Sequence, residues 1–196
     1  QTDGFSTLIV RFKACETERL ASPFPTHPSS VVPTMLKVTD LVGNKELGDE
    51  FIGGPLMIAR LCPVDYHRYH YPDDGKTLDS YQLHGDYHSV NPIALKHKED
   101  IFIKNERRVS ILETKHFGKL AYIEVGAMCV GKIVQTQDES IDFKKGEEKG
   151  YFLFGGSTVV VCGEKGKWSP SEDMLSNTEK GIETYIQLGD EVGVKI

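Results

Sequence analysis

The stretch "LFGGSTVVV", residues 153–161, joins two glycines to a serine, a threonine and a run of β-branched apolar residues. One interpretation is a tight glycine turn that leads into a buried strand. The other is chemical: the serine hydroxyl attacks the carbonyl carbon of the residue before it. Gly156 suits that attack because it has no Cβ to block it, and the rigid strand would hold Ser157 still. The stretch by itself is compatible with both.

The segments around this stretch predict the fold class. Residues 107–115 and 119–136 carry branched and aromatic residues at the alternating spacing of half-buried strands. "PLMIARLCPV" (55–64) predicts a buried strand that ends at Pro63, and residues 171–185 are the clearest helical stretch. We therefore predict a mainly β (α+β) fold, a single domain of short twisted antiparallel strands with a few short helices. Residues 133–156 resemble the compact sandwich of lipoyl-carrier domains but lack the lysine that is modified there.

Length and charge narrow the function classes. The chain has 196 residues, 39% of them apolar, and a net charge of -6. It is long enough to bury one core, and its acidic balance argues against a nucleic-acid partner. No run approaches the roughly 18 apolar residues of a transmembrane helix. The chain begins at Gln1 without a signal-peptide pattern, so we expect an N-terminal segment to be missing from it.

Cysteine usage indicates neither disulfides nor zinc. The cysteines are Cys15, Cys62, Cys129 and Cys162, and none forms a C-x-x-C pair. A chain of this length does not need disulfide staples, and structural zinc sites use closely spaced ligands. We predict reduced thiols and no metal.

The stretch "DYHRYHYPDDG" (65–75) holds two histidines three positions apart, His67 and His70. Prolines on both sides exclude a long helix here. A surface hairpin with "PDDG" as its turn is one interpretation, because these residues favour turns. A metal pair would need a third ligand, and none is evident nearby. Acid–base catalysis is the remaining interpretation, since histidine titrates near neutral pH.

Four motifs in order resemble the phosphatidylserine decarboxylase family of self-processing pyruvoyl enzymes. They are "RLCPVDYHRYHYPDDG" (60–75), "HGDYHSVNPIAL" (84–95), "HFGKLAYIEVGAMCVGKIV" (116–134) and "KKGEEKGYFLFGGSTVVV" (144–161). The resemblance covers about residues 50–193 and is nearest to the branch whose processing motif is Gly-Gly-Ser-Thr. It implies self-cleavage between Gly156 and Ser157. Residues 1–156 would form the β-chain, and residues 157–196 would form an α-chain whose N-terminal pyruvoyl group derives from Ser157.

The resemblance also implies residue roles. The second histidine of the family's D-Y-H-R-x-H motif is the base for self-cleavage, which places that role on His70. The first, His67, would handle the substrate and return a proton during decarboxylation. The family's triad aspartate has no direct match in "FKACETERLASPFPT" (12–26). Matching "KACE" to the family's Ser-Ala-Ala-Asp gives Glu16, which we prefer, and anchoring on "FPT" gives Glu18.

The implied reaction converts phosphatidylserine to phosphatidylethanolamine with release of CO2. The pyruvoyl carbonyl would condense with the substrate amine and accept electrons as CO2 leaves, without a metal or pyridoxal phosphate. Two alternatives stay open at this point: the same mechanism on a free amino acid such as tryptophan, and an unprocessed homologue that only binds a lipid or a partner. We expect peripheral membrane association, with a cytoplasmic location as the alternative. The sequence also allows a homodimer.

The second motif, "HGDYHSVNP" (84–92), is expected to lie near the active site. His84 and His88 there are candidates to bind a phosphate or carboxylate of the substrate, and a polar edge loop is the alternative. Met128 and its apolar neighbours are assigned to the core.

Overall fold

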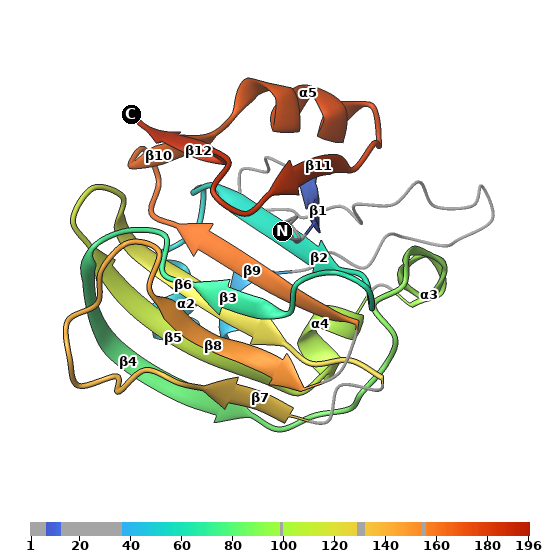
Figure 1. The fold of residues 1–196 in the computed structure, drawn as a ribbon, viewed down its shortest axis with the longest axis horizontal. Coiled ribbons are helices and arrows are strands. Elements are labelled where there is room, and N and C mark those ends of the chain that lie inside the picture. Colours follow the sequence, from blue (N-terminus) through green and yellow to red (C-terminus); the bar gives the residue numbers. More distant parts are fainter. Residues whose placement is uncertain (1–6, 13–36, 99, 129–131, 154–155) are drawn as a thin grey trace, which may run out of the picture.

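The largest element of the fold is a seven-stranded antiparallel sheet (Figure 1). The computed structural model describes residues 7–12, 37–98, 100–128, 132–153 and 156–196. In spatial order the strands of this sheet are β11 (Thr184–Gln187), β1 (Thr7–Phe12), β2 (Leu56–Leu61), β9 (Ser157–Gly163), β6 (Gly118–Val125), β5 (Arg107–Thr114) and β4 (Gly75–Leu83).

A smaller three-stranded antiparallel sheet lies across one face of the large sheet (Figure 1). Its strands are, in spatial order, β3 (Arg68–His70), β8 (Glu148–Leu153) and β7 (Lys132–Gln135). Aromatic rings join the two sheets: the centroids of Tyr69 on β3 and Tyr122 on β6 are 6.3 Å apart. The Tyr122 hydroxyl also donates to the carbonyl of His70 at 3.3 Å. The hydrophobic core extends beyond the contact between the sheets: it includes Tyr69 and Phe152 of the small sheet and also Val38, Leu41 and Val42 of a short helix.

The remaining elements are short. Strands β10 (Trp168–Pro170) and β12 (Gly193–Lys195) form a two-stranded pair. The helices are α1 (Val38–Val42), α2 (Lys45–Asp49), α3 (Pro92–His97), α4 (Ile101–Lys104) and α5 (Glu172–Glu179). The structure confirms the predicted mainly β fold of antiparallel strands with a few short helices.

Strand β9 is the central buried strand, as its sequence predicts. It pairs with β2 on one side and with β6 on the other, and each of its residues is buried. Ser157 is its first residue and lies opposite Leu61 of β2, while Thr158 lies opposite Val125 of β6. The apolar run after Ser157 therefore anchors that residue at one end of the most rigid part of the sheet.

Two sequence expectations need correction. Residues 65–75 do not form a hairpin, because β3 pairs with β8 in the small sheet and β4 pairs with β5 in the large one. Met128 is not in the core: it is 58% exposed, whereas its neighbours Val125 and Ala127 are buried. The chain leaves the large sheet after β6 and crosses to β7 of the small one, so Met128 lies on the connection between sheets rather than within a strand.

Two of the four cysteines lie in the described ranges. Cys62 and Cys162 are free, and burial raises the pKa of Cys162 to about 12. Cys15 and Cys129 lie outside the described residues.

Candidate active site

The link between Gly156 and Ser157 has the backbone and the burial that the chemical interpretation requires. Gly156 has φ = 92°, in the region that side chains rarely adopt. The side chain of Ser157 is 0% exposed, and within the described residues its Oγ has no hydrogen-bond partner. Buried hydroxyls are normally hydrogen-bonded, so one without a partner in the described ranges, directly after a glycine with positive φ, is a candidate functional position.

A tight turn brings His67 to this link. Asp65 closes the turn, since its N–H donates to the Cys62 carbonyl at 2.8 Å and its Oδ2 accepts from the Cys62 N–H at 2.6 Å. The Asp65 carbonyl lies 2.7 Å from His67 Nδ1, and the Gly156 N–H donates to His67 Nε2 at 3.0 Å. A carbonyl oxygen only accepts, so Nδ1 carries the proton and Nε2 is the acceptor.

His70 lies on β3 and faces different partners. Its Nδ1 donates to the Gly146 carbonyl at 3.0 Å, and its Nε2 lies 3.1 Å from the Tyr66 hydroxyl. The Tyr66 and His70 rings are stacked, with centroids 5.8 Å apart. The Gly146 carbonyl fixes the same tautomer as in His67 and leaves Nε2 basic. The hydrogen bonds thus bring His67 to Gly156 and hold the His70 ring against Tyr66.

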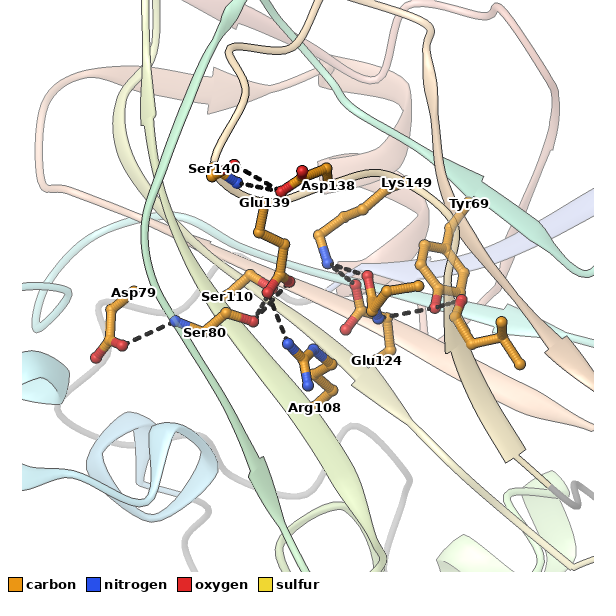
Figure 2. Close-up of polar contacts among 12 residues, drawn as sticks. Tyr69, Asp79, Ser80, Arg108, Ser110, Glu124, Asp138, Glu139, Ser140 and Lys149 are labelled. Atoms are coloured by element: carbon orange, nitrogen blue, oxygen red, sulfur yellow. Dashed lines mark hydrogen bonds and ion pairs between the residues drawn. The ribbon is translucent and has the colours of Figure 1, made fainter.

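A buried ion pair joins the two sheets beside the row that carries Ser157 (Figure 2). Lys149 on β8 donates to Glu124 Oε1 on β6 at 2.8 Å and to Gln135 Oε1 at 2.8 Å. Both charged side chains are 0% exposed. Burial raises the pKa of Glu124, while the charge of Lys149 and its hydrogen bond oppose that rise. In register, Glu124 lies opposite Val159, which places it on the same face of the sheet as Ser157.

A second group of hydrogen-bonded polar side chains, on β5 and β4, lies beside the ion pair (Figure 2). Arg108 lies opposite Glu124 in register and donates to Glu139 Oε2 at 2.7 Å. Ser80 on β4 donates to Glu139 Oε1 at 2.7 Å. Polar and charged side chains therefore occupy part of the layer between the sheets. The sequence did not predict this polar group.

The two histidines of the second motif lie near the end of the β4–β5 pair. His84 is exposed, with its Nδ1 3.7 Å from Glu106 Oε2. His88 Nε2 lies 2.6 Å from the ammonium of Lys98 and 3.1 Å from Asp86 Oδ2.

Several residues of the site were not predicted from the sequence, and two predicted ones lie outside the described residues. Asp65 was overlooked, although "CPVD" has the composition of a turn and could have revealed it. The buried Lys149–Glu124 pair left no sequence signal beyond a glutamate inside the apolar run "AYIEV". The candidate triad acids Glu16 and Glu18 lie outside the described residues. In the described ranges there is no group of three or more His, Cys, Asp or Glu side chains arranged to hold a metal ion. None of the helices there is long and apolar enough to cross a membrane.

Comparisons with known proteins show the family of the chain. The family model for phosphatidylserine decarboxylase matches residues 22–194. The chain is 45% identical over 157 residues to the phosphatidylserine decarboxylase proenzyme of Clostridium novyi (strain NT), covering 80% of this chain and 53% of that protein. It is 46% identical over 156 residues to the proenzyme of Clostridium tetani (strain Massachusetts / E88), covering 80% and 52%. The chain thus spans about half the length of the relatives that it matches.

Proposed function

We propose that this chain, which belongs to the phosphatidylserine decarboxylase family, is the catalytic part of a self-processing enzyme that decarboxylates phosphatidylserine. The observation that carries the proposal is the buried hydroxyl of Ser157, which has no hydrogen-bond partner in the described part of the chain and directly follows a glycine at φ = 92° that is bonded to a histidine. The relatives' description as proenzymes supports a maturation step.

In the proposed maturation, Ser157 Oγ attacks the carbonyl carbon of Gly156. The C–N bond between the two residues breaks, and an ester forms with the nitrogen of Ser157 as a free amine. Loss of the Ser157 α-proton expels the Gly156 carboxylate and leaves dehydroalanine. After tautomerisation, water hydrolyses the imine to a pyruvoyl group and ammonia. The products are residues 1–156 and residues 157–196.

The two histidines take different parts in this proposal. His67 holds the Gly156 N–H and thereby fixes the segment that is cut. His70 acts as the base, because its Nδ1–H bond to Gly146 leaves Nε2 free of a proton. To reach Ser157 it has to give up the Tyr66 hydroxyl, a neutral partner that is cheap to exchange. Glu16, or Glu18 in second place, would support the protonated imidazole.

The site also fits the pyruvoyl group that the family implies. Ser157 is its source, and the buried start of β9 would hold it in a fixed position. When present, the group supplies an electrophilic carbonyl that takes up the substrate amine and draws electrons as CO2 leaves. His67 lies beside this position, so we assign to it the return of the proton to the product.

Exposed apolar side chains near Ser157 support contact with a lipid surface. Val64, in the loop after β2, is 93% exposed, and Met128, after β6, is 58% exposed. The carbonyl of Met128 would lie 3.9 Å from a Cβ placed on Gly156. Apolar side chains next to a site that acts on a lipid headgroup can enter the interfacial region of a bilayer. A homodimer stays a prediction, which sedimentation equilibrium of the purified protein would test.

The test is release of CO2 from phosphatidylserine in mixed micelles and from free aromatic amino acids. We expect release from the lipid only, and none from the Ser157→Ala variant. Release from the free amino acid alone would replace the lipid by that substrate. An uncut, inactive protein would instead support a homologue that only binds. Val64→Asp with Met128→Asp should reduce cosedimentation with phosphatidylserine vesicles while leaving self-cleavage intact.

A further inference from the structure

The row of the large sheet that contains Ser157 continues across two further strands. Val125 of β6 lies opposite Thr158 of β9 and Arg107 of β5, so the next position, Gly126, comes beside Ser157 on one side and Glu106 on the other. The Gly126 N–H donates to the Glu106 carbonyl at 2.9 Å, which confirms the continued pairing with β5. Side chains at these positions point to the same face of the sheet.

The ring of Tyr87 packs beside Gly126 in this row. A Cβ placed on Gly126 would lie 3.5 Å from Tyr87 Cε1 and 3.7 Å from Cδ1. Directly opposite positions in an antiparallel pair have Cβ atoms about 4.5–5.5 Å apart, so the Tyr87 ring lies within one side chain's reach of residue 157. Burial and a hydrogen bond with Glu106 raise the pKa of the Tyr87 hydroxyl, which therefore keeps its proton.

A buried asparagine fixes the segment that carries Tyr87. Asn105 is fully buried, and its Oδ1 accepts from the His88 N–H at 2.9 Å. Its Nδ2 donates to the His88 carbonyl at 2.8 Å and to the Gly126 carbonyl at 2.7 Å. One side chain thus clamps both backbone groups of His88 to the end of β6. Asn105 therefore holds the segment of Tyr87 and His88 at Gly126, the position next to Ser157 in the sheet.

Lys98 donates to the side chain of His88, the residue whose backbone Asn105 holds. The Lys98 ammonium lies 2.6 Å from His88 Nε2, and Asp86 Oδ2 lies 3.1 Å from the same nitrogen. The His88 side chain is partly exposed, whereas Asp86 is mostly exposed and therefore easily displaced by a stronger anion. Tyr87, whose ring packs at Gly126, is followed directly in the chain by the histidine that Lys98 contacts.

We infer that Lys98, positioned by His88, binds the phosphodiester of the lipid headgroup, and that Tyr87 lines the site beside residue 157. This inference rests on the proposed function. A serine phospholipid carries its amine and carboxylate at one end and a phosphodiester beyond the serine Cβ. The Lys98 ammonium can stabilise phosphate oxygens through charge-assisted hydrogen bonds, while His88 Nε2, as its acceptor, holds it in place. Free amino acids have no phosphate, so this pair would distinguish the lipid from them.

The test uses glycerophosphoserine, which has the phosphodiester but no acyl chains. In Lys98→Gln we expect normal self-cleavage, a kcat within twofold of the wild type, and a KM raised about tenfold, as the loss of one hydrogen bond to a charged group predicts. Lys98→Arg should restore the KM, and His88→Gln should raise it as well. The matched control is Lys180→Gln, an exposed lysine after α5, which should change nothing.

Other results would overturn the inference. An unchanged KM in both Lys98→Gln and His88→Gln would remove the pair from substrate binding. A lower kcat with unchanged KM would do the same. If inorganic phosphate inhibits the wild type at concentrations near the KM of glycerophosphoserine, the pair is a site for free phosphate rather than for the headgroup. A wild-type protein that stays uncut refutes the proposed function instead, before the comparison begins.

Discussion

Replacing Lys149 by methionine should destabilise the protein strongly. Lys149 and Glu124 are 0% exposed and joined at 2.8 Å, and Gln135 provides the second acceptor. Removing one member leaves an uncompensated buried charge, which costs about 3–5 kcal/mol in comparable pairs. That is a large share of the roughly 5–15 kcal/mol that holds a domain of this size folded. The loss would also loosen the small sheet, whose β3 and β8 flank His67 and Gly156.

The loss of stability caused by Lys149→Met should depend on pH in a defined direction. Burial already raises the pKa of Glu124, and removing Lys149 takes away a charge that opposes the rise. The folded variant then binds a proton more tightly than the unfolded chain does. Its stability falls as pH rises from the unfolded pKa of about 4.3 through the raised folded pKa, by up to about 1.4 kcal/mol per pH unit. The variant should therefore lose more relative to the wild type at pH 7 than at pH 5.

Urea denaturation at both pH values measures these free energies of unfolding. The experiment belongs in a Ser157→Ala background, so that a single uncut chain unfolds. The matched control is the double variant Lys149→Met with Glu124→Gln, which buries no unpaired charge and should lose less than Lys149→Met alone. If Lys149→Met lowers the free energy of unfolding by less than about 1 kcal/mol, or by the same amount at both pH values, Lys149 and Glu124 do not form an ion pair shielded from water.

Three further predictions concern maturation. His70→Ala should stop self-cleavage, whereas His67→Ala should allow at least partial cleavage but weaken CO2 release; equal cutting in His70→Ala and the wild type on a denaturing gel would remove His70 as the base. Glu16→Gln should slow cutting more than Glu18→Gln in one time course, because the amide cannot support a protonated imidazole; the reverse order would transfer the role to Glu18. Gly156→Ala should slow cutting, since φ = 92° strains a side chain there by about 1–3 kcal/mol, and an unchanged rate would show that the strain is irrelevant.

The sequence predicted the strands better than it predicted their partners. Alternation and β-branched residues mark "RRVSILET" and "STVVV" as strands because each buries at least one face. The assignment of β7 and β8 to a second sheet depends on contacts between distant segments, which local periodicity does not contain. Met128 shows the same limit, since an apolar residue after a buried strand is in the core only if the strand continues.

Part of the candidate site was accessible from the sequence. The glycines and serine of "GGST" and the histidines of "DYHRYH" were identified, and the structure brings His67 to Gly156. The contacts of the two histidines could not be predicted from their spacing. His67 and His70 are three residues apart, but the turn at Asp65 and the start of β3 orient their rings toward different partners. Lys149 could not be predicted to be buried, because a lysine in a strand is usually exposed and only its distant partner Glu124 reverses that expectation.

Mass spectrometry of the purified protein under denaturing conditions tests the central claim most directly. The account predicts two fragments, residues 1–156 and residues 157–196, with a pyruvoyl group in place of Ser157 at the start of the smaller one. It also predicts a single intact chain for Ser157→Ala. A wild-type chain that remains intact after prolonged incubation, or a Ser157→Ala variant that still splits at this bond, would contradict the assignment of Ser157 as the nucleophile.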